Sequence, residues 1–178
     1  MRRLSEGVVL PPQKGEIPEP WPPGWTIEGV VRALEPLVVD ARRERLRSVI
    51  DARLACVTVL MDSPHDPHNA GAVLRSCDAF GIQELHVVPR EEAFAISTTV
   101  TRGSEKWVDL VQHPSPAVAV AGLVGRGFEL VSTHPEGTLV PEDLARVPRL
   151  ALVLGNEHDG IRADLERAAT RSVRVPMR

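Results

Sequence analysis

The sequence predicts an α/β domain in which helices flank a mainly parallel sheet. From residue 56 onward, short apolar runs alternate with helical patterns, which is typical of strand–helix–strand units. The length of 178 residues suits one domain with an appended terminal segment. A hydrophobic fraction of 43% is enough for one core and argues against global disorder.

Residues 1–25 are expected to form an irregular arm. Six prolines fall between Pro11 and Pro23, and proline removes a backbone donor and fixes φ, so neither a helix nor a central strand is expected there. Trp21 and Trp25 either pin this arm onto a surface or are incidental aromatics in a flexible tail.

Two short helices are expected next. The first has apolar residues at i, i+3, i+4 and i+7 and Thr26 as its N-cap; these residues are Ile27, Val30, Val31 and Leu34. The second runs from about Ala41 to Arg53, after Asp40, and its apolar stripe is Leu46, Val49 and Ile50.

The second helix is rich in arginine. Five arginines outnumber Glu44 and Asp51, which gives the window a charge of +3; they are Arg42, Arg43, Arg45, Arg47 and Arg53. The run is either a solvated helix face or a surface for RNA phosphates, which arginine binds in a bidentate way.

The remaining elements follow in order. Strands are expected at Val57–Met61, Glu84–Val88, Trp107–Val111, Phe128–Ser132, Leu150–Leu154 and Ser172–Val175. Helices are expected at Ala70–Phe80, Pro116–Gly125 and Ala163–Thr170. The stretch Arg90–Glu105 is a long connection rich in Ser, Thr and charge, and loops of that length are often functional.

The composition bears on the partners and the cellular compartment of the protein. The net charge of −3 neither demands nor excludes a nucleic-acid partner. Cys56 and Cys77 are expected to be reduced core residues, which suits a cytoplasmic protein. The N-terminus has no apolar stretch long enough for a signal peptide, and no run approaches the ~20 apolar residues of a membrane span.

Chemistry is expected where strands end, because open parallel sheets bind ligands beyond the carboxyl ends of their strands. After the strand Val57–Met61, Asn69 is expected to cap a helix, and Gly71 would let a partner approach its first turn closely. Arg75 follows about 9 Å further along the helix axis. It either projects into a cleft beside the strand ends or forms a surface ion pair with Asp78.

A metal site is the alternative for the same segment. His65 and His68, with Asp62 and Asp66, have residue types that bind metals. Pro64 and Pro67 are expected to prevent a regular helix there, and no further ligand is evident. No metal is therefore expected.

Two later segments also end strands. Gly155–Ile161 follows Leu150–Leu154 and has a glycine at each end of a tight turn, either to offer backbone groups to an adenine or ribose or only to form the turn. Neither the GxGxxG nor the GxxxxGK[ST] fingerprint is present. Val173–Arg178 could lay its backbone against a ligand or be an ordinary terminal strand.

Together and in order, these segments resemble the three motifs of the SpoU family of RNA ribose methyltransferases, in its TrmH-like branch. His68–Ser76 resembles the first motif, Leu154–Gly160 the second, and Val175–Met177 the opening of the third. The resemblance extends from about Asp40 to the end and includes the segment Arg102–Val108.

This resemblance implies a trefoil knot in the C-terminal half, S-adenosylmethionine as cofactor, and a homodimer that completes the site. It implies catalytic roles for Arg75, Asn69 and Glu157. It implies contacts to the methyl donor at Thr133, Gly155, Val175 and Met177. It also implies that Arg42, Arg43, Arg45 and Arg47 bind RNA, with tRNA favoured over ribosomal RNA and a D-loop guanosine as the target.

The family's third motif normally continues into a segment that closes the knot, and this sequence stops at Arg178. We therefore expect residues 1–54 to be an arm with a basic helical extension, and residues 55–178 to be a methyltransferase domain truncated at its C-terminus, with an incomplete knot. The alternative function is a non-catalytic RNA-binding or dimerisation protein on this truncated scaffold. A metal-dependent hydrolase built on His65, His68 and Asp62 is a third hypothesis.

The implied reaction is in-line attack of a ribose 2′-oxygen on a sulfonium methyl group. The resemblance implies that Arg75 is the base, but a guanidinium stays protonated in proteins. We therefore assign Arg75 to orienting and stabilising the developing alkoxide, while a substrate phosphate or water takes the proton.

Overall fold

The sheet has six strands in the order β6-β4-β3-β8-β7-β9, and every neighbouring pair is parallel. The computed structural model describes residues 3–5, 8–9, 24–89 and 94–177. The strands are β3 (Val57–Asp62), β4 (Glu84–Val88), β6 (Asp109–Gln112), β7 (Glu129–Thr133), β8 (Leu150–Leu154) and β9 (Arg171–Val173). The predicted mainly parallel sheet is confirmed.

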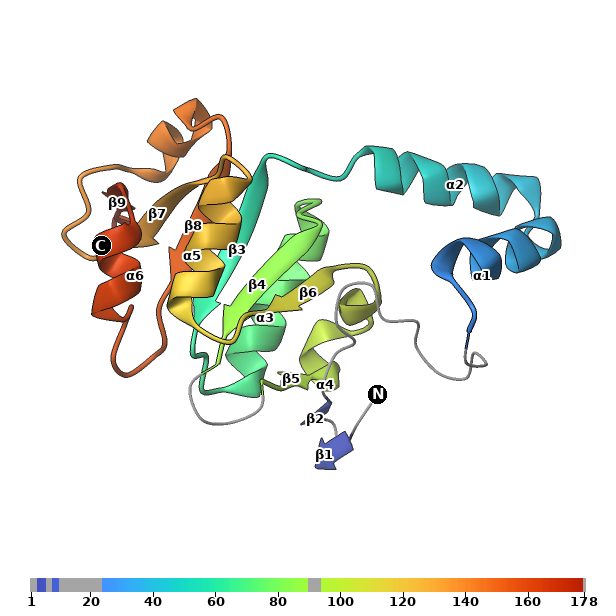
Figure 1. The fold of residues 1–178 in the computed structure, drawn as a ribbon, viewed down its shortest axis with the longest axis horizontal. Coiled ribbons are helices and arrows are strands. Elements are labelled where there is room, and N and C mark those ends of the chain that lie inside the picture. The colour runs from blue at the N-terminus through green and yellow to red at the C-terminus, as the bar shows by residue number, and fades with distance from the viewer. Residues whose placement is uncertain (1–2, 6–7, 10–23, 90–93, 178) are drawn as a thin grey trace.

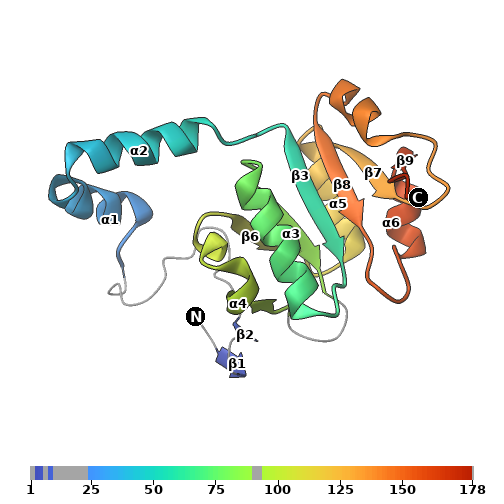
Figure 2. The same ribbon diagram turned by 180° about the vertical axis from the view of Figure 1, so that it is seen from behind.

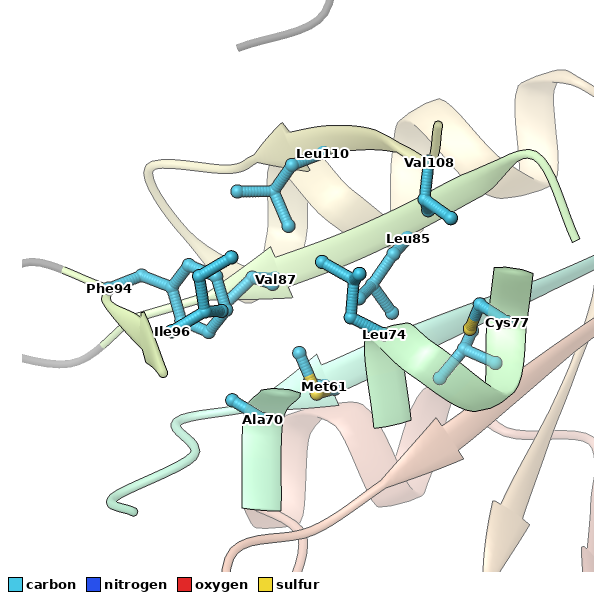
Figure 3. Packing of buried hydrophobic residues seen from close by; sticks show 11 residues of the cluster. Met61, Ala70, Leu74, Cys77, Leu85, Val87, Phe94, Ile96, Val108 and Leu110 are labelled. Carbon is cyan, nitrogen blue, oxygen red and sulfur yellow. The ribbon is translucent and has the colours of Figure 1, made fainter. Parts of the chain in front are cut away.

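Helices cover both faces of this sheet (Figures 1 and 2). One face carries α3 (Pro67–Ala79), and the other carries α5 (Pro116–Gly125) and α6 (Ala163–Ala168). Side chains of β3 alternate between the faces, so Val59 and Met61 belong to the core under α3, while Leu60 belongs to the core under α5. Figure 3 shows the α3 side, where Leu74 packs among strand residues such as Leu85.

The long connection after β4 is more ordered than predicted. It contains β5 (Ile96–Ser97), α4 (Thr98–Thr101) and the 3₁₀ turn η2 (Ser104–Lys106). Gly71 of α3 lies against these elements, because a Cβ there would be 3.3 Å from the carbonyl oxygen of Ser97. The prediction that Gly71 permits close approach is therefore confirmed, and the partner is this chain itself.

Two short strands precede the prolines. They are β1 (Arg3–Ser5) and β2 (Val8–Val9), and β2 pairs antiparallel with β5. The expectation of an irregular arm over residues 1–25 was wrong for these two short strands, because the proline argument applies only from Pro11 onward. The proline-rich stretch itself, with Trp21, lies outside the described residues.

The basic extension is a helical arm that projects away from the sheet (Figures 1 and 2). It comprises α1 (Ile27–Leu34), the turn η1 (Glu35–Leu37) and α2 (Asp40–Asp51). Thr26 caps α1 as predicted, since its side chain accepts from the backbone nitrogen of Gly29 at 3.1 Å. In the described part of the chain these elements bury no side chain, and most of their apolar stripe residues, such as Ile27, Val31 and Ile50, are exposed.

The two cysteines differ. Cys77 is buried, and burial raises its thiol pKa to about 12, which makes it unreactive. Cys56 is exposed, so the prediction of a core residue was wrong: it precedes β3 instead of lying inside it.

Among the described residues, each helix is too short or too polar to span a membrane.

The neighbouring strands β3 and β8 connect to helices on opposite faces of the sheet. After β3 the chain enters α3 on one face, and after β8 it enters α6 on the other, although β3 and β8 are neighbours. Connections that leave adjacent strands for opposite faces open a crevice at their carboxyl ends, where open α/β sheets bind ligands.

Candidate functional site

Two loops that are distant in sequence meet beyond the carboxyl ends of β3 and β8. Asn69, after β3, donates from Nδ2 to Oε1 of Glu157, after β8, at 2.6 Å. The backbone nitrogen of His65 donates to Oε2 of Glu157 at 3.3 Å. The structure thus brings two of the predicted site residues together.

The start of α3 orients Asn69. Asp66 is the N-cap, because its side chain accepts from the backbone nitrogen of His68 at 2.8 Å, and Pro67 is the first helical residue. Asn69 was predicted as the cap, and this was wrong; it lies in the first turn, where its side chain reaches Glu157. No regular helix was expected across His65–His68, and α3 does begin only at Pro67, because proline suits the first helical position.

Hydrogen bonds favour the ionised form of Glu157. Partial burial would raise its pKa, but the Asn69 amide and backbone donors, including those of His65 and Asp66, lower the pKa below its usual value. An ionised carboxylate makes a stronger hydrogen bond than a neutral one. The link between the two loops is therefore charge-assisted at neutral pH.

The turn after β8 is closed by backbone and side-chain contacts. The backbone nitrogen of Asn156 donates to the carbonyl of Gly160 at 3.1 Å, and its Oδ1 accepts two backbone N–H groups within the turn. A Cβ at Gly155 would lie 2.6 Å from the backbone nitrogen of Ile161. Gly160 has φ +69°. The geometry of the turn therefore favours glycine at both positions. Gly155 is also exposed.

Arg75 lies on the exposed face of α3. Its expected surface partner, Asp78, is bonded instead to Arg53 at 2.6 Å. Among the described residues Arg75 makes no ion pair. The guanidinium is thus available to an external anion about 9 Å along the helix axis from Asn69.

The sequence did not reveal Asp62 and Arg162 as a pair. Asp62 ends β3 with a fully buried side chain, and Nε of Arg162 donates to its Oδ1 at 2.6 Å. Arg162 immediately precedes α6. Because 100 positions separate the partners, no local pattern could have found this contact.

The third predicted segment lies beside β7. Thr133 ends β7, faces Val173 in the parallel ladder and donates from Oγ1 to the carbonyl of Val153 at 3.1 Å. The next residue, His134, donates its backbone nitrogen to the carbonyl of Val173 at 2.9 Å. Val175 and Met177 are 66% and 90% exposed, so the structure leaves both side chains accessible.

The arginines of α2 are unevenly paired. Arg43 contacts Asp40, and Arg47 contacts Glu35 at 2.8 Å. Arg42 and Arg45 are exposed and form no ion pair within the described ranges. These two side chains are the most available of the four to phosphates.

The metal hypothesis finds no support. No group of three or more His, Cys, Asp or Glu side chains in the described part of the chain could hold a metal ion. Asp62 is bonded to Arg162, and His68 contacts Asp66 at 3.2 Å. His65 packs edge-on against His158, with ring centroids 5.4 Å apart.

A cavity of about 480 Å³ lies at the opposite, amino edge of the sheet. Its lining includes Arg53, Arg126, Phe128 and Arg149, and none of the residues predicted for the site. The cavity and the predicted site are therefore separate places in the fold.

The carboxyl edge fits a polar ligand such as S-adenosylmethionine. Nδ2 of Asn156 is buried and has no hydrogen-bond partner among the described residues, and an unsatisfied buried donor is costly. The exposed backbone of Gly155 directly follows β8, and the hydroxyl of Thr133 lies at the end of the neighbouring strand β7. These groups are of the types that bind adenosine and amino-acid moieties.

Residues 56–178 match the SpoU rRNA Methylase family. The tRNA (guanosine(18)-2′-O)-methyltransferase of Aquifex aeolicus is 31% identical over 146 residues, which are 81% of this chain and 69% of that relative. The crystal structure of the A. aeolicus TrmH/SpoU tRNA modifying enzyme is similar, with a TM-score of 0.68 and 31% identity, and covers 78% of this chain and 72% of its own.

A more distant structure shares the fold. The SpoU methyltransferase AviRb from Streptomyces viridochromogenes, solved in complex with AdoMet, gives a TM-score of 0.56 at 24% identity, over 71% of this chain and 49% of that chain. The family match, the sheet order and the meeting of the first two motifs agree with one another. The chain belongs to the SpoU rRNA methylase family and is an RNA methyltransferase.

Proposed function

We propose that the chain transfers a methyl group from S-adenosylmethionine to a ribose 2′-hydroxyl of tRNA, at a D-loop guanosine. The observation that carries this proposal is the 2.6 Å contact between Asn69 and Glu157, which joins two motifs at the carboxyl edge. The relatives named for tRNA guanosine-18 methylation support the choice of substrate.

Three side chains have distinct roles in the proposal. Arg75, cationic and without an ion pair among the described residues, orients the attacking oxygen and stabilises the alkoxide as it forms. Asn69 presents its polar atoms about 9 Å away along the helix axis, and ionised Glu157 fixes the Asn69 amide. The ribose proton goes to a substrate phosphate or to water, because a guanidinium stays protonated.

Four residues are proposed to contact the methyl donor: Thr133, Gly155, Val175 and Met177. When bound, S-adenosylmethionine supplies an electrophilic sulfonium methyl group. Gly155 offers its backbone, since the turn leaves it no room for a side chain. Exposed Val175 and Met177 would cover apolar parts of the cofactor.

The arm is proposed to hold the RNA. In the proposed division, residues 1–54 are the N-terminal extension that includes this arm, and residues 55–178 are the methyltransferase domain. Phosphates bind along α2 of the arm through Arg42, Arg43, Arg45 and Arg47. We further propose that two copies associate to complete the site, and that the enzyme works in the cytoplasm, where its tRNA substrate is made.

The test combines binding with product mapping. Calorimetry of the purified chain with S-adenosylmethionine should give one binding isotherm. Methyl transfer from radiolabelled cofactor should occur on unmodified tRNA, and should stop when the target guanosine carries a 2′-deoxyribose. Ribosomal RNA fragments serve as the substrate control.

Each outcome separates the alternatives. Transfer to ribosomal RNA but not to tRNA would reassign the substrate within the family. RNA binding without cofactor binding or methyl transfer would refute the proposal and favour a non-catalytic RNA-binding role.

A further inference from the structure

The pair of Asp62 and Arg162 is built unlike an ordinary surface ion pair. The Asp62 side chain has no exposed surface, and the Arg162 side chain is 24% exposed. Arg162 uses three groups on this carboxylate, because its backbone nitrogen, Nε and Nη2 each lie 2.6 Å from an Asp62 oxygen. A buried carboxylate is tolerated only when it is paired and hydrogen-bonded.

The same arginine also reaches a second strand. Nη2 of Arg162 also donates to the carbonyl of Val88, at the end of β4, at 3.3 Å. Ser63 donates to both Asp62 and the Val88 carbonyl, at 3.1 Å and 3.3 Å. One guanidinium therefore ties the segment before α6 to the ends of β3 and β4.

These contacts fix both ends of the turn that carries Glu157. At the first end, Leu154 of β8 pairs with Met61 of β3. At the second end, Arg162 returns to Asp62, the next residue of β3. The turn Gly155–Ile161 is thus held against two consecutive residues of one strand, which limits where Glu157 can lie.

We propose that Arg162, through Asp62, is a positioning residue of the methyltransferase site. It holds the turn Gly155–Ile161 so that Glu157 meets Asn69 and the His65 backbone. This inference rests on the proposed function for its kinetic consequence. A misplacement of about 1 Å at such a site can cost as much as ~100-fold in rate.

A matched control pair exists at the other edge of the sheet. Arg53 and Asp78 are also 2.6 Å apart, with side chains 10% and 25% exposed. Arg53 also approaches the backbone carbonyl of Asp78 at 3.4 Å. The two pairs have the same 2.6 Å distance, although Asp78 is less buried than Asp62, and only Asp62 and Arg162 adjoin the turn that carries Glu157.

The experiment compares Arg162→Lys with Arg53→Lys in the full chain. Lysine keeps the charge but loses the fork of donors. For Arg162→Lys, kcat should fall between about tenfold and about 100-fold, and amide hydrogen exchange should accelerate in the peptide covering residues 155–161. Arg53→Lys should lower Tm to a similar extent and leave kcat and exchange in that peptide unchanged.

Equal kinetics and equal local exchange in the two variants would overturn the inference. If the wild-type chain transfers no methyl group to any RNA, the proposed function fails, while the exchange comparison still tests whether Arg162 holds the turn. If Arg162→Lys does not fold, the double variant Asp62→Leu/Arg162→Leu leaves no buried charge unpaired. It should fold with the turn exchanging rapidly, and normal protection there would contradict the proposal.

Discussion

The two edges of the sheet use charge differently. At the carboxyl edge, Glu157 bridges loops that belong to distant parts of the sequence, and Arg75 makes no ion pair among the described residues. At the amino edge, Arg126 pairs with Glu84 at 2.6 Å. The guanidinium carbons of Arg126 and Arg149 lie 5.3 Å and 4.6 Å from the Phe128 ring centroid.

This difference indicates that charged side chains have different roles at the two edges. Side chains whose polar groups are satisfied by one another stabilise the fold, whereas accessible side chains can meet a ligand. Substitution of an accessible side chain at the carboxyl edge, such as Arg75, should therefore change chemistry with little change in stability. Substitutions at the amino edge should do the reverse.

The largest expected effect is at Arg75. Arg75→Ala should abolish turnover, with a loss of about 1000-fold or more, since an electrostatic stabiliser of the transition state contributes on this scale. Cofactor affinity by calorimetry should stay nearly unchanged. Arg126→Ala is the amino-edge control and should retain kcat while lowering Tm. Equal loss of turnover and cofactor affinity in Arg75→Ala would contradict the assigned role.

The second effect is a pH dependence of folding. Burial, and then the neighbouring His113, lower the pKa of His86 to about 4 from 6.5. The ring of His86 lies 3.4 Å from Oε2 of Glu84 and 2.9 Å from the ring of His113. The unfolded chain binds a proton as pH falls through 6.5, and the folded chain resists it until about pH 4.

Acidification should therefore destabilise the folded chain. Stability from neutral His86 is fully present above pH 6.5 and is lost as pH falls towards 4, by about 3 kcal/mol. Urea unfolding at pH 7.5 and 4.5 measures the difference. The variant His86→Gln should flatten the dependence between these values, and an unchanged slope would show that His86 is not its source.

The third effect concerns the turn after β8. Gly155→Ala would bring a Cβ to 2.6 Å from the Ile161 backbone nitrogen, so the turn must shift and cofactor affinity should fall about 100-fold. Gly122→Ala in α5 is the control, because nothing lies within 4 Å of its Cβ position. Helix propensity should make that variant more stable by up to about 1 kcal/mol. Unchanged cofactor affinity in Gly155→Ala would separate this turn from the binding site.

The smallest effect is expected on the arm. The double variant Arg42→Ala/Arg45→Ala should weaken tRNA affinity about tenfold and reduce the slope of log affinity against log salt by about two. Filter binding at several salt concentrations measures both. Arg146→Ala, which removes another exposed arginine, should change neither. An unaltered slope in the double variant would mean that the arm is only a solvated helix face.

Much of the fold could be predicted from local sequence. The predicted limits of β4, α5 and β8 coincide with the structure, because each is a short apolar segment bounded by turn residues. Ser115 illustrates the boundary signal, since its hydroxyl accepts from the backbone nitrogen of Val118 and caps α5. The connection after β4 was harder, because β5 depends on pairing with β2 rather than on its own pattern.

The candidate site was predicted from the order of the three motifs along the sequence. The local pattern around each residue was not sufficient to predict its contacts. Asp66, His68 and Asn69 are close in sequence and all polar, so pattern alone could not decide which of them caps α3. Asp62 was grouped with histidines as a metal ligand, whereas it pairs with Arg162. Such long-range pairs leave no periodic signal, since their partners are brought together only by the sheet order.

The central place of β8 has a consequence for folding. It lies between β3 and β7, and Val57 pairs with Leu150 near the other end of the chain. Contacts between such distant segments form slowly, because the intervening chain must first be ordered. A folding intermediate that lacks β8 would already contain α3 with Asn69 and Arg75, but Glu157 would have no fixed position. The contact between Asn69 and Glu157 therefore forms only when β8 is inserted, and under the proposed function a chain folded without β8 would be inactive.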